Sequence, residues 1–136
     1  MLVNVAFQIL RSMTALSQTM TAFRLISFGV HGALELVIGL ALIAAPFALG
    51  FGPAATIAGV AVGAMIVGLA LGAATLEVDR GSVSGHHAYD WGAVLGIAAA
   101  AAVLAAVGES AAAITFAAAG VAMTALALTT RYSLPR

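Results

Sequence analysis

The chain has 136 residues, of which 63% are hydrophobic and 7% charged, with five basic and five acidic side chains and no cysteine. A soluble domain carries roughly 25% charged residues, so this composition excludes a water-soluble domain and predicts an integral membrane protein. The lack of cysteine excludes disulfides and thiolate metal sites, and the scattered arginines exclude a nucleic-acid patch.

Residues 1–24 precede the first long apolar stretch. Apolar side chains between Val3 and Phe23 recur at helical spacing, with polar side chains between them. This pattern is typical of an amphipathic N-terminal segment that lies in the membrane interface. Two alternatives remain open: a loose leader, or an over-long start with translation beginning at Met13 or Met20.

Four apolar stretches are long enough to cross a bilayer, which takes about 20 helical residues. They run approximately over residues 25–49, 54–76, 91–107 and 111–128. Backbone polar groups in lipid must pair within their own segment, so each stretch is predicted to be a helix. A short turn rich in glycine and proline joins the first span to the second, and a short turn that contains glycine joins the third to the fourth. The sequence therefore predicts an all-α membrane fold, a four-transmembrane-helix bundle of two hairpins, residues 25–76 and 91–130.

The polar stretch 77–90 is predicted to be a loop between the hairpins, and residues 131–136 a C-terminal tail. An even number of spans places both termini and this loop on the same side of the membrane. All five arginines then lie on that side, and the positive-inside rule predicts that this side is cytoplasmic.

The first span carries two ionisable residues, His31 and Glu35, one helical turn apart on one face. With Arg24 at the inner boundary, helical rise places Glu35 about 16 Å deep, near the middle of a roughly 30 Å hydrocarbon core. A carboxylate there should face the bundle interior, pair or stay protonated. The pair is either a proton-accessible or ligand-binding site, or a buried hydrogen bond. Within the spans its main polar partners would be Thr56, Thr75, Thr115 and Thr124.

Glycines recur at four-residue spacing in the second and third spans, where they allow membrane helices to approach closely. The spacing fits a homo-oligomer interface or packing inside the bundle, and the second interpretation is favoured. Pro46, about a turn before the end of the first span, predicts a helix kink. The helix-packing glycines are Gly59, Gly63, Gly68, Gly72, Gly92 and Gly96.

A second polar cluster precedes the third span and contains His86, His87, Tyr89 and Asp90, followed by Trp91. Histidines His86 and His87 with Asp90 are weak candidates for a metal site, but adjacent histidines diverge on a helix. The favoured alternative is a polar loop followed by an interfacial aromatic belt, so we expect no metal and no cofactor. No phosphate loop, nucleophile motif or HExxH sequence is present, and no enzyme is predicted.

A shift of 57 residues aligns the second hairpin with the first, which indicates parallel repeats. Glu35 then falls on Gly92, so we expect the second hairpin to lack a copy of the ionisable pair. That absence argues against a symmetric two-site carrier. The aligned glycines are Gly39 with Gly96 and Gly63 with Gly120.

The stretch 39–51 contains Ala45-Pro46-Phe47 near the end of a glycine-bearing helix, and Asp90-Trp91 opens the third span. These features resemble the SPW repeat of small bacterial membrane proteins, with Ala-Pro-Phe here in place of Ser-Pro-Trp and no proline in the second copy. HdeD-like short-repeat membrane proteins are the second family that it resembles. The resemblance covers about residues 25–130 and implies the helical architecture, without a catalytic activity. It also implies a bacterial cytoplasmic (inner) membrane, which the chain would cross several times, and the positions of the arginines predict that both termini are cytoplasmic.

Two classes of function follow as expectations. The first is a non-enzymatic structural or interaction protein that self-associates or binds another membrane protein in the lipid bilayer, with a role in envelope or stress physiology. The second is a small transporter or proton-coupled channel subunit that uses Glu35. Neither involves nucleic acid.

Overall fold

The computed structural model describes residues 25–75 and 80–132 of the chain. This part of the chain folds into four helices, each with an apolar stretch long enough to cross a membrane. The predicted all-α four-helix bundle is therefore confirmed. The helices are α2 (Phe28–Leu49), α3 (Pro53–Thr75), α4 (Arg80–Ala106) and α5 (Ser110–Thr129). The predicted amphipathic segment, residues 1–24, lies outside the described residues.

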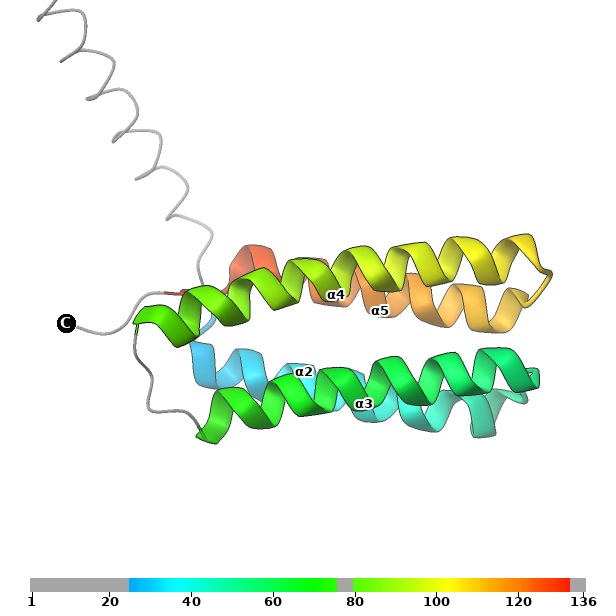
Figure 1. Ribbon diagram of the computed structural model, residues 1–136, viewed down its shortest axis with the longest axis horizontal. Coiled ribbons are helices and arrows are strands. Elements are labelled where there is room, and N and C mark those ends of the chain that lie inside the picture. The colour runs from blue at the N-terminus through cyan, green and yellow to red at the C-terminus, as the bar shows by residue number, and fades with distance from the viewer. Residues whose placement is uncertain (1–24, 76–79, 133–136) are drawn as a thin grey trace, which may run out of the picture.

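The helices run side by side along the long axis of the molecule (Figure 1). α2 packs closely against α3, and α4 against α5, while the two hairpins meet mainly through α2 and α5. Both short interhelical turns lie at one end of the bundle, called here the turn end (Figure 1). The described chain ends lie at the opposite end, the terminal end. The two hairpins therefore run in the same direction, as a parallel repeat requires.

The first turn follows the local chemistry of its residues. α2 continues through Pro46 without a break and ends at Leu49, and Gly50 caps it with a φ of +66°. The backbone N–H groups of Gly50 and Phe51 both donate to the carbonyl oxygen of Pro46. Glycine adopts this left-handed conformation without strain, and Pro53 then begins α3, where a missing N–H is no loss. The kink expected at Pro46 stays a prediction.

The start of α4 differs from the prediction. Residues 80–90 were expected in the loop 77–90, but α4 begins at Arg80. Hydropathy locates where a segment becomes apolar, whereas a helix continues through polar residues whose side chains pair inside the bundle. His86 and Asp90 are such residues, because both are buried. Because α4 begins at Arg80, His86 and Asp90 lie on one helix, and their side chains are one helical turn apart.

Two of the predicted packing glycines bring α2 and α3 into backbone contact. A Cβ at Gly63 would lie 2.6 Å from the carbonyl oxygen of Gly39. A Cβ at Gly59 would lie 2.8 Å from Cγ of the Pro46 ring. These glycines therefore pack within the bundle. The second hairpin does not repeat the contact, because Gly120 faces the Ile97 side chain at 3.3 Å instead.

The remaining predicted packing glycines face open space. A Cβ at Gly68, Gly72, Gly92 or Gly96 would meet nothing within 4 Å. Three of them, Gly68, Gly92 and Gly96, line an apolar groove of about 560 Å³ beside α3 and α4. No close approach inside the described chain therefore requires the absence of a Cβ at these positions.

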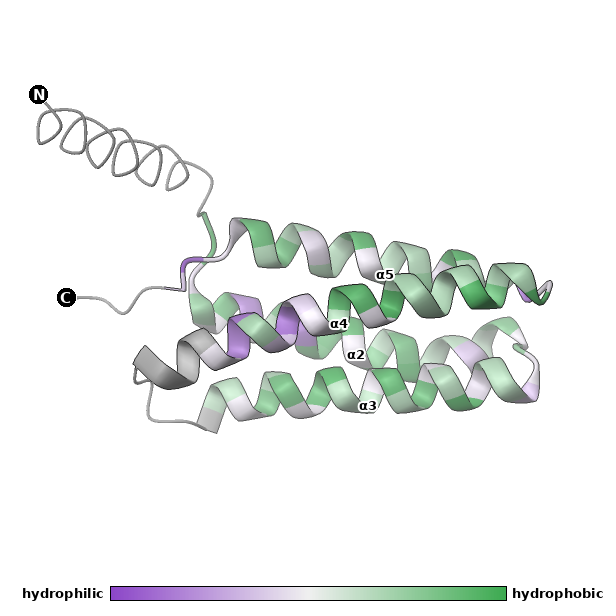
Figure 2. Cartoon of the chain, turned by 45° about the horizontal axis from the view of Figure 1, so that its top comes forward, coloured by the Kyte–Doolittle hydropathy of each residue, from purple (hydrophilic) through white to green (hydrophobic). Residues whose placement is uncertain are grey.

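Hydrophobic residues predominate along most of the four helices (Figure 2). Large apolar side chains point outward on all four helices, and Val37, Ile57, Leu95 and Val121 are each more than half exposed. A soluble protein rarely exposes so much apolar surface, so the finding agrees with a multi-pass membrane protein. Hydrophilic residues on α2 and α4 gather toward the terminal end (Figure 2).

Candidate metal centre

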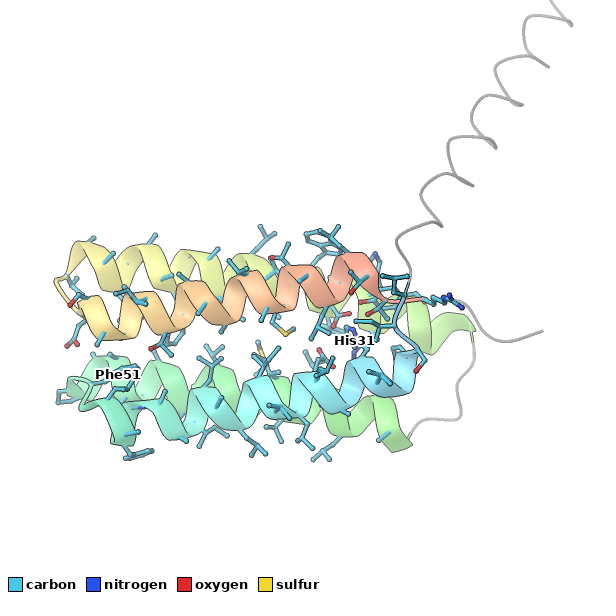
Figure 3. The ribbon with its side chains drawn as sticks, turned by 180° about the vertical axis from the view of Figure 1, so that it is seen from behind. His31 and Phe51 are labelled. Atoms are coloured by element: carbon cyan, nitrogen blue, oxygen red, sulfur yellow. The ribbon has the colours of Figure 1, made fainter. Side chains whose placement is uncertain are left out.

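The centre begins with the two ionisable residues of α2. His31 and Glu35 are one turn apart, and both side chains are fully buried. His31 points into the bundle interior near the terminal end, whereas Phe51 lies at the turn end (Figure 3). Glu35 is the eighth of the 22 residues of α2, so it lies in the half of the helix that is nearer the terminal end.

α4 contributes a second pair at the same spacing. His86 follows His31 by 55 residues, and Asp90 follows Glu35 by 55. His86 is 7% exposed and Asp90 is fully buried. The expectation that the second hairpin lacks a copy of the pair is therefore wrong. The 57-residue alignment, set by glycines, hid a His-x-x-x-acid repeat that is offset by two residues.

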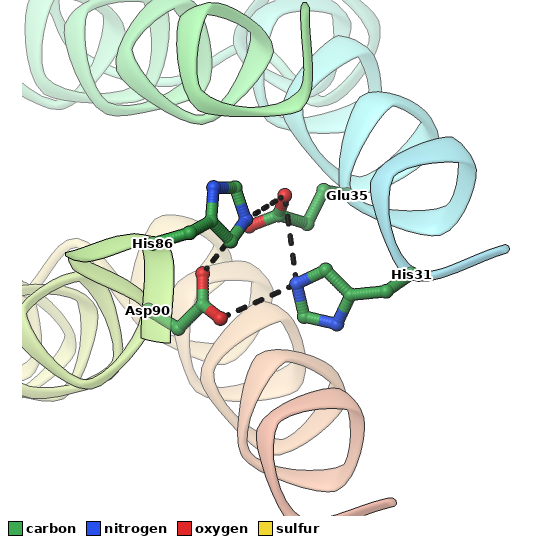
Figure 4. A group of neighbouring side chains, drawn as sticks. All are labelled: His31, Glu35, His86 and Asp90. Carbon is green, nitrogen blue, oxygen red and sulfur yellow. Dashed lines mark hydrogen bonds and ion pairs between the residues drawn. The ribbon is translucent and has the colours of Figure 1, made fainter. Parts of the chain in front are cut away.

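The two pairs point toward one another across the bundle interior and close a ring (Figure 4). His31 Nε2 lies 3.6 Å from Glu35 Oε2 and 3.3 Å from Asp90 Oδ2. His86 Nε2 lies 3.1 Å from Glu35 Oε2 and 3.4 Å from Asp90 Oδ1. Each histidine thus faces one carboxylate from its own helix and one from the other helix.

A hydrogen bond to the other nitrogen of the His31 imidazole determines which nitrogen faces the carboxylates of Glu35 and Asp90. Thr130 Oγ1 donates to the carbonyl oxygen of Leu126 at 2.6 Å, so its single hydrogen is used. The same oxygen lies 2.8 Å from His31 Nδ1 and accepts the Nδ1–H bond. In the neutral ring the Nε2 lone pair then faces the two carboxylates, and this nitrogen has no hydrogen-bond partner among the described residues.

The arrangement needs positive charge between the carboxylates. Two ionised carboxylates in an apolar interior are strongly unfavourable unless they are neutralised. Protons on both histidines, protons on both carboxyl groups, or one divalent cation bound by neutral histidines and ionised carboxylates makes the cluster neutral. The buried atoms Glu35 Oε1 and Asp90 Oδ1 also have no hydrogen-bond partner among the described residues. The cluster therefore retains free lone pairs on three of its residues.

The four side chains are a plausible ligand set for a metal ion. Each offers one ligand atom, and these atoms all lie within 4.8 Å of one another. Zn²⁺ binds nitrogen and oxygen at about 2.0–2.2 Å in a tetrahedron, which gives ligand–ligand edges of about 3.3–3.6 Å. The four histidine–carboxylate distances span 3.1 to 3.6 Å, with Asp90 facing His31 through Oδ2 and His86 through Oδ1. Small shifts of the side chains would bring all four atoms onto one ion.

Aromatic rings enclose the centre. Phe28 stacks on His31 with a centroid distance of 6.1 Å and meets His86 edge-on at 5.1 Å. Tyr132 meets His31 at 5.6 Å and donates to Asp90 Oδ2 at 2.5 Å. Burial, together with the bond to Asp90, raises the pKa of Tyr132 above its ordinary value, so the phenol remains a donor. An apolar shell of this kind limits water access to a metal site.

The sequence had pointed to some of these residues and missed others. His87 stays outside the ring and packs against Tyr132 at 4.2 Å, which removes it from the candidate ligands. Three of the threonines expected as partners donate to backbone carbonyl oxygens instead: Thr56, Thr115 and Thr124. Thr130 and Tyr132 were missed, because they follow the last span and only the fold brings them to the site.

The buried polar residues of the described chain are few. They are His31, Glu35, His86, Asp90 and Thr130. All five belong to the ring or bond directly to it, so the polar interior of the bundle is a single centre. Neither a family model, nor a curated protein, nor a solved structure matches the chain.

Proposed function

We propose that the protein binds one divalent transition-metal ion inside the membrane, with Zn²⁺ as the best fit to the ligand spacing. The ligands are one nitrogen or oxygen atom from each of the four ring residues, called here the metal centre: His31, Glu35, His86 and Asp90. The observation that carries the proposal is the buried His31 Nε2, which faces two carboxylates at 3.3 and 3.6 Å without a hydrogen bond.

Those distances favour a metal over a pair of protons. A charged hydrogen bond between imidazolium and carboxylate is about 2.7–2.9 Å long. The contact of His86 Nε2 with Glu35 Oε2, at 3.1 Å, is within hydrogen-bond range, whereas the other three, at 3.3 to 3.6 Å, are longer. All four are close to the separation of ligands around a common ion. Histidine and carboxylate together suit first-row divalent ions, and a four-coordinate site suits Zn²⁺.

A set of four protein ligands supports retention of the ion rather than catalysis. Catalytic zinc sites keep one position open for water or substrate, whereas structural sites are closed. The role proposed is therefore that of a non-enzymatic membrane protein whose bound ion joins its two hairpins. This extends the expected structural or interaction role and keeps a part in envelope physiology as a prediction.

The transporter alternative receives less support. Between the centre and the turn end, the buried side chains of the described helices are apolar and include Leu42, Ile66, Ile97 and Phe116. An ion or proton would find no ligand along this path. A transporter or proton-coupled channel subunit that uses Glu35 therefore ranks below the metal-binding structural role. A flux assay in proteoliposomes distinguishes these two functions.

The direct test compares metal binding by the detergent-solubilised protein and by matched variants. We expect the wild-type chain to hold one Zn²⁺ after dialysis, measured by elemental analysis, and His86→Ala to lose it. His87→Ala is the control, because this neighbouring histidine lies outside the centre. A wild-type protein that binds no Zn²⁺, Co²⁺ or Mn²⁺ more tightly than His86→Ala would overturn the proposal.

The orientation in the membrane is part of the proposal. Arg80 and Arg131 lie at the terminal end, to which the positive-inside rule assigns the cytoplasm. The centre would then take its ion from the cytoplasmic side of a bacterial inner membrane. Labelling of a cysteine added at the turn end, from outside intact cells, tests this assignment. The likeness to the SPW repeat remains a prediction as well.

Self-association is a second candidate, favoured by the open groove beside α3 and α4. Gly68, Gly92 and Gly96 leave room there for the backbone of a helix from a second copy. We expect Gly96→Leu to lower the oligomer mass in detergent without changing metal content. An unchanged mass, or a wild-type monomer, would remove this interface.

A further inference from the structure

The segment Thr130–Tyr132, called here the C-terminal strap, is fixed beside the start of α2. Ile26 N donates to the carbonyl oxygen of Thr129 at 3.1 Å, and Arg131 N donates to the carbonyl oxygen of Ile26 at 2.9 Å. The two segments thereby form a short parallel bridge. These backbone bonds hold the strap beside Ile26, two residues before α2 begins, so its side chains have defined positions over the metal centre.

Two side chains of the strap each hold one ligand of the centre, on different helices. Thr130 Oγ1 accepts from His31 Nδ1 at 2.8 Å, and Tyr132 donates to Asp90 Oδ2 at 2.5 Å. These bonds have different consequences. The first leaves Nε2 of His31 as the ligand atom, and the second occupies one of the two carboxylate oxygens of Asp90.

The other oxygen, Asp90 Oδ1, is buried and without a hydrogen-bond partner among the described residues. It lies 3.4 Å from His86 Nε2, on the inside of the ring. Oδ2 also faces the ring, 3.3 Å from His31 Nε2, but it already accepts from Tyr132, so Oδ1 is the Asp90 oxygen that is free of hydrogen bonds for an ion. A carboxylate that is free to turn can instead bind an ion through both oxygens and raise its coordination number.

We propose that the C-terminal strap sets the coordination number of the metal centre and thereby its preference among metal ions. This inference rests on the proposed metal site. In it, Tyr132 keeps Asp90 monodentate, and Thr130 keeps His31 bound through Nε2. Tyr132 and Thr130 are positioning residues, since neither is a ligand. Four ligands in a tetrahedron favour Zn²⁺, whereas Mn²⁺ prefers more oxygen ligands in an octahedral arrangement.

The test compares the wild-type chain with Tyr132→Phe, which removes only the phenolic oxygen. Tyr89→Phe is the matched control, because Tyr89 is two-thirds exposed on α4. Zn²⁺ and Mn²⁺ affinities are measured by competition with a chromophoric chelator. We expect Tyr132→Phe to weaken Zn²⁺ about 10–100-fold, the usual effect of losing an outer-shell partner, and to weaken Mn²⁺ less, so that the Zn²⁺/Mn²⁺ preference narrows.

A spectroscopic readout separates positioning from a general loss of packing. Tetrahedral Co²⁺ absorbs visible light strongly, and Co²⁺ with five or six ligands absorbs weakly. We expect an intense Co²⁺ spectrum in the wild type and in Tyr89→Phe, and a weaker one in Tyr132→Phe at full Co²⁺ occupancy. Thr130→Val should lose affinity because the His31 tautomer is no longer held, and Thr130→Ser should restore it.

The outcomes separate the two proposals. A wild-type protein without metal affinity overturns the metal site and this inference together. A wild-type protein that binds Zn²⁺ tightly, while Tyr132→Phe keeps the same Zn²⁺/Mn²⁺ ratio and Co²⁺ spectrum, overturns the role of the strap alone. Loss of affinity in Thr130→Ser equal to that in Thr130→Val also counts against it.

Discussion

His31 Nε2 and Asp90 Oδ2 lie 3.3 Å apart, although α2 and α4 belong to different hairpins. Both side chains are fully buried, so this contact joins the hairpins through charged groups at the terminal end of an otherwise apolar bundle. Removing one partner of such a buried contact lowers stability strongly, because the other charged group is left buried without a partner. The packing of the two hairpins against each other therefore depends on how the charges of these four side chains are neutralised.

Replacing Glu35 by glutamine should abolish tight metal binding. The change keeps the shape of the side chain but removes the negative charge and a good oxygen ligand. We expect Zn²⁺ affinity to fall by more than about 100-fold, beyond what outer-shell changes cause. Isothermal titration of the detergent-solubilised protein measures it.

The control for this variant is Glu109→Gln. Glu109 lies at the turn end, where Oε2 accepts from Gly52 N at 3.4 Å, far from the centre along the bundle. It should bind Zn²⁺ as the wild type does. Equal loss in both glutamine variants would point to a general effect of removing an acid and would contradict the assignment of Glu35.

Zn²⁺ should stabilise the fold by linkage, since the complete ligand set exists only in the folded bundle. At free Zn²⁺ 100-fold above Kd, the free energy of unfolding should rise by about 2.7 kcal/mol. Thermal unfolding followed by circular dichroism, with Zn²⁺ and with a chelator, checks this. The shift should vanish in His86→Ala and persist in His87→Ala, and a shift of equal size in both variants would mean that Zn²⁺ acts elsewhere.

Gly63→Ala should destabilise the bundle, and Gly68→Ala should not. The new Cβ at Gly63 would lie 2.6 Å from the carbonyl oxygen of Gly39, and relieving such overpacking costs typically 1–3 kcal/mol. Gly68 has open space at the same atom. Unfolding in graded denaturing detergent compares the two variants, and similar midpoints for both would show that the close approach of α2 and α3 is not required.

Reconstituted vesicles should show no Zn²⁺ or proton flux above that of empty vesicles. The apolar core between the centre and the turn end offers no ligand to a moving ion. Fluorescent Zn²⁺ and pH indicators inside the vesicles provide the measurement. A flux that disappears in Glu35→Gln and survives in Glu109→Gln would instead establish the transporter alternative.

Much of the architecture follows from composition and hydropathy. Four apolar stretches of sufficient length predict four helices, because lipid leaves the backbone no other partners. Gly50 and Pro53 mark the first turn, where φ and the missing N–H decide the local conformation. Hydropathy failed only where polar residues continue a helix, at 80–90, since it measures the environment of side chains and not the backbone.

The candidate site was only half predictable. His31 and Glu35 stand out as ionisable residues within a span, and helical spacing alone places them on one face. His86 and Asp90 were seen, but a loop gives no fixed relation between side chains, so the His-x-x-x-acid repeat could not be recognised as a face of α4. Alignment by glycines added to the error, because packing and ligand positions repeat at different offsets in the two hairpins.

The sequence by itself determined the membrane-type composition, the helices and the ionisable pair of α2, since these depend on local hydropathy and helical spacing. Only the tertiary structure decided that the pair meets His86 and Asp90, and that Thr130 and Tyr132 return to hold two of the four side chains. These relations depend on how two hairpins pack and where the chain after α5 lies. The distances of 3.3 Å between His31 and Asp90 and of 3.1 Å between His86 and Glu35 join residues far apart in the chain, and they arise from packing, which no local pattern encodes.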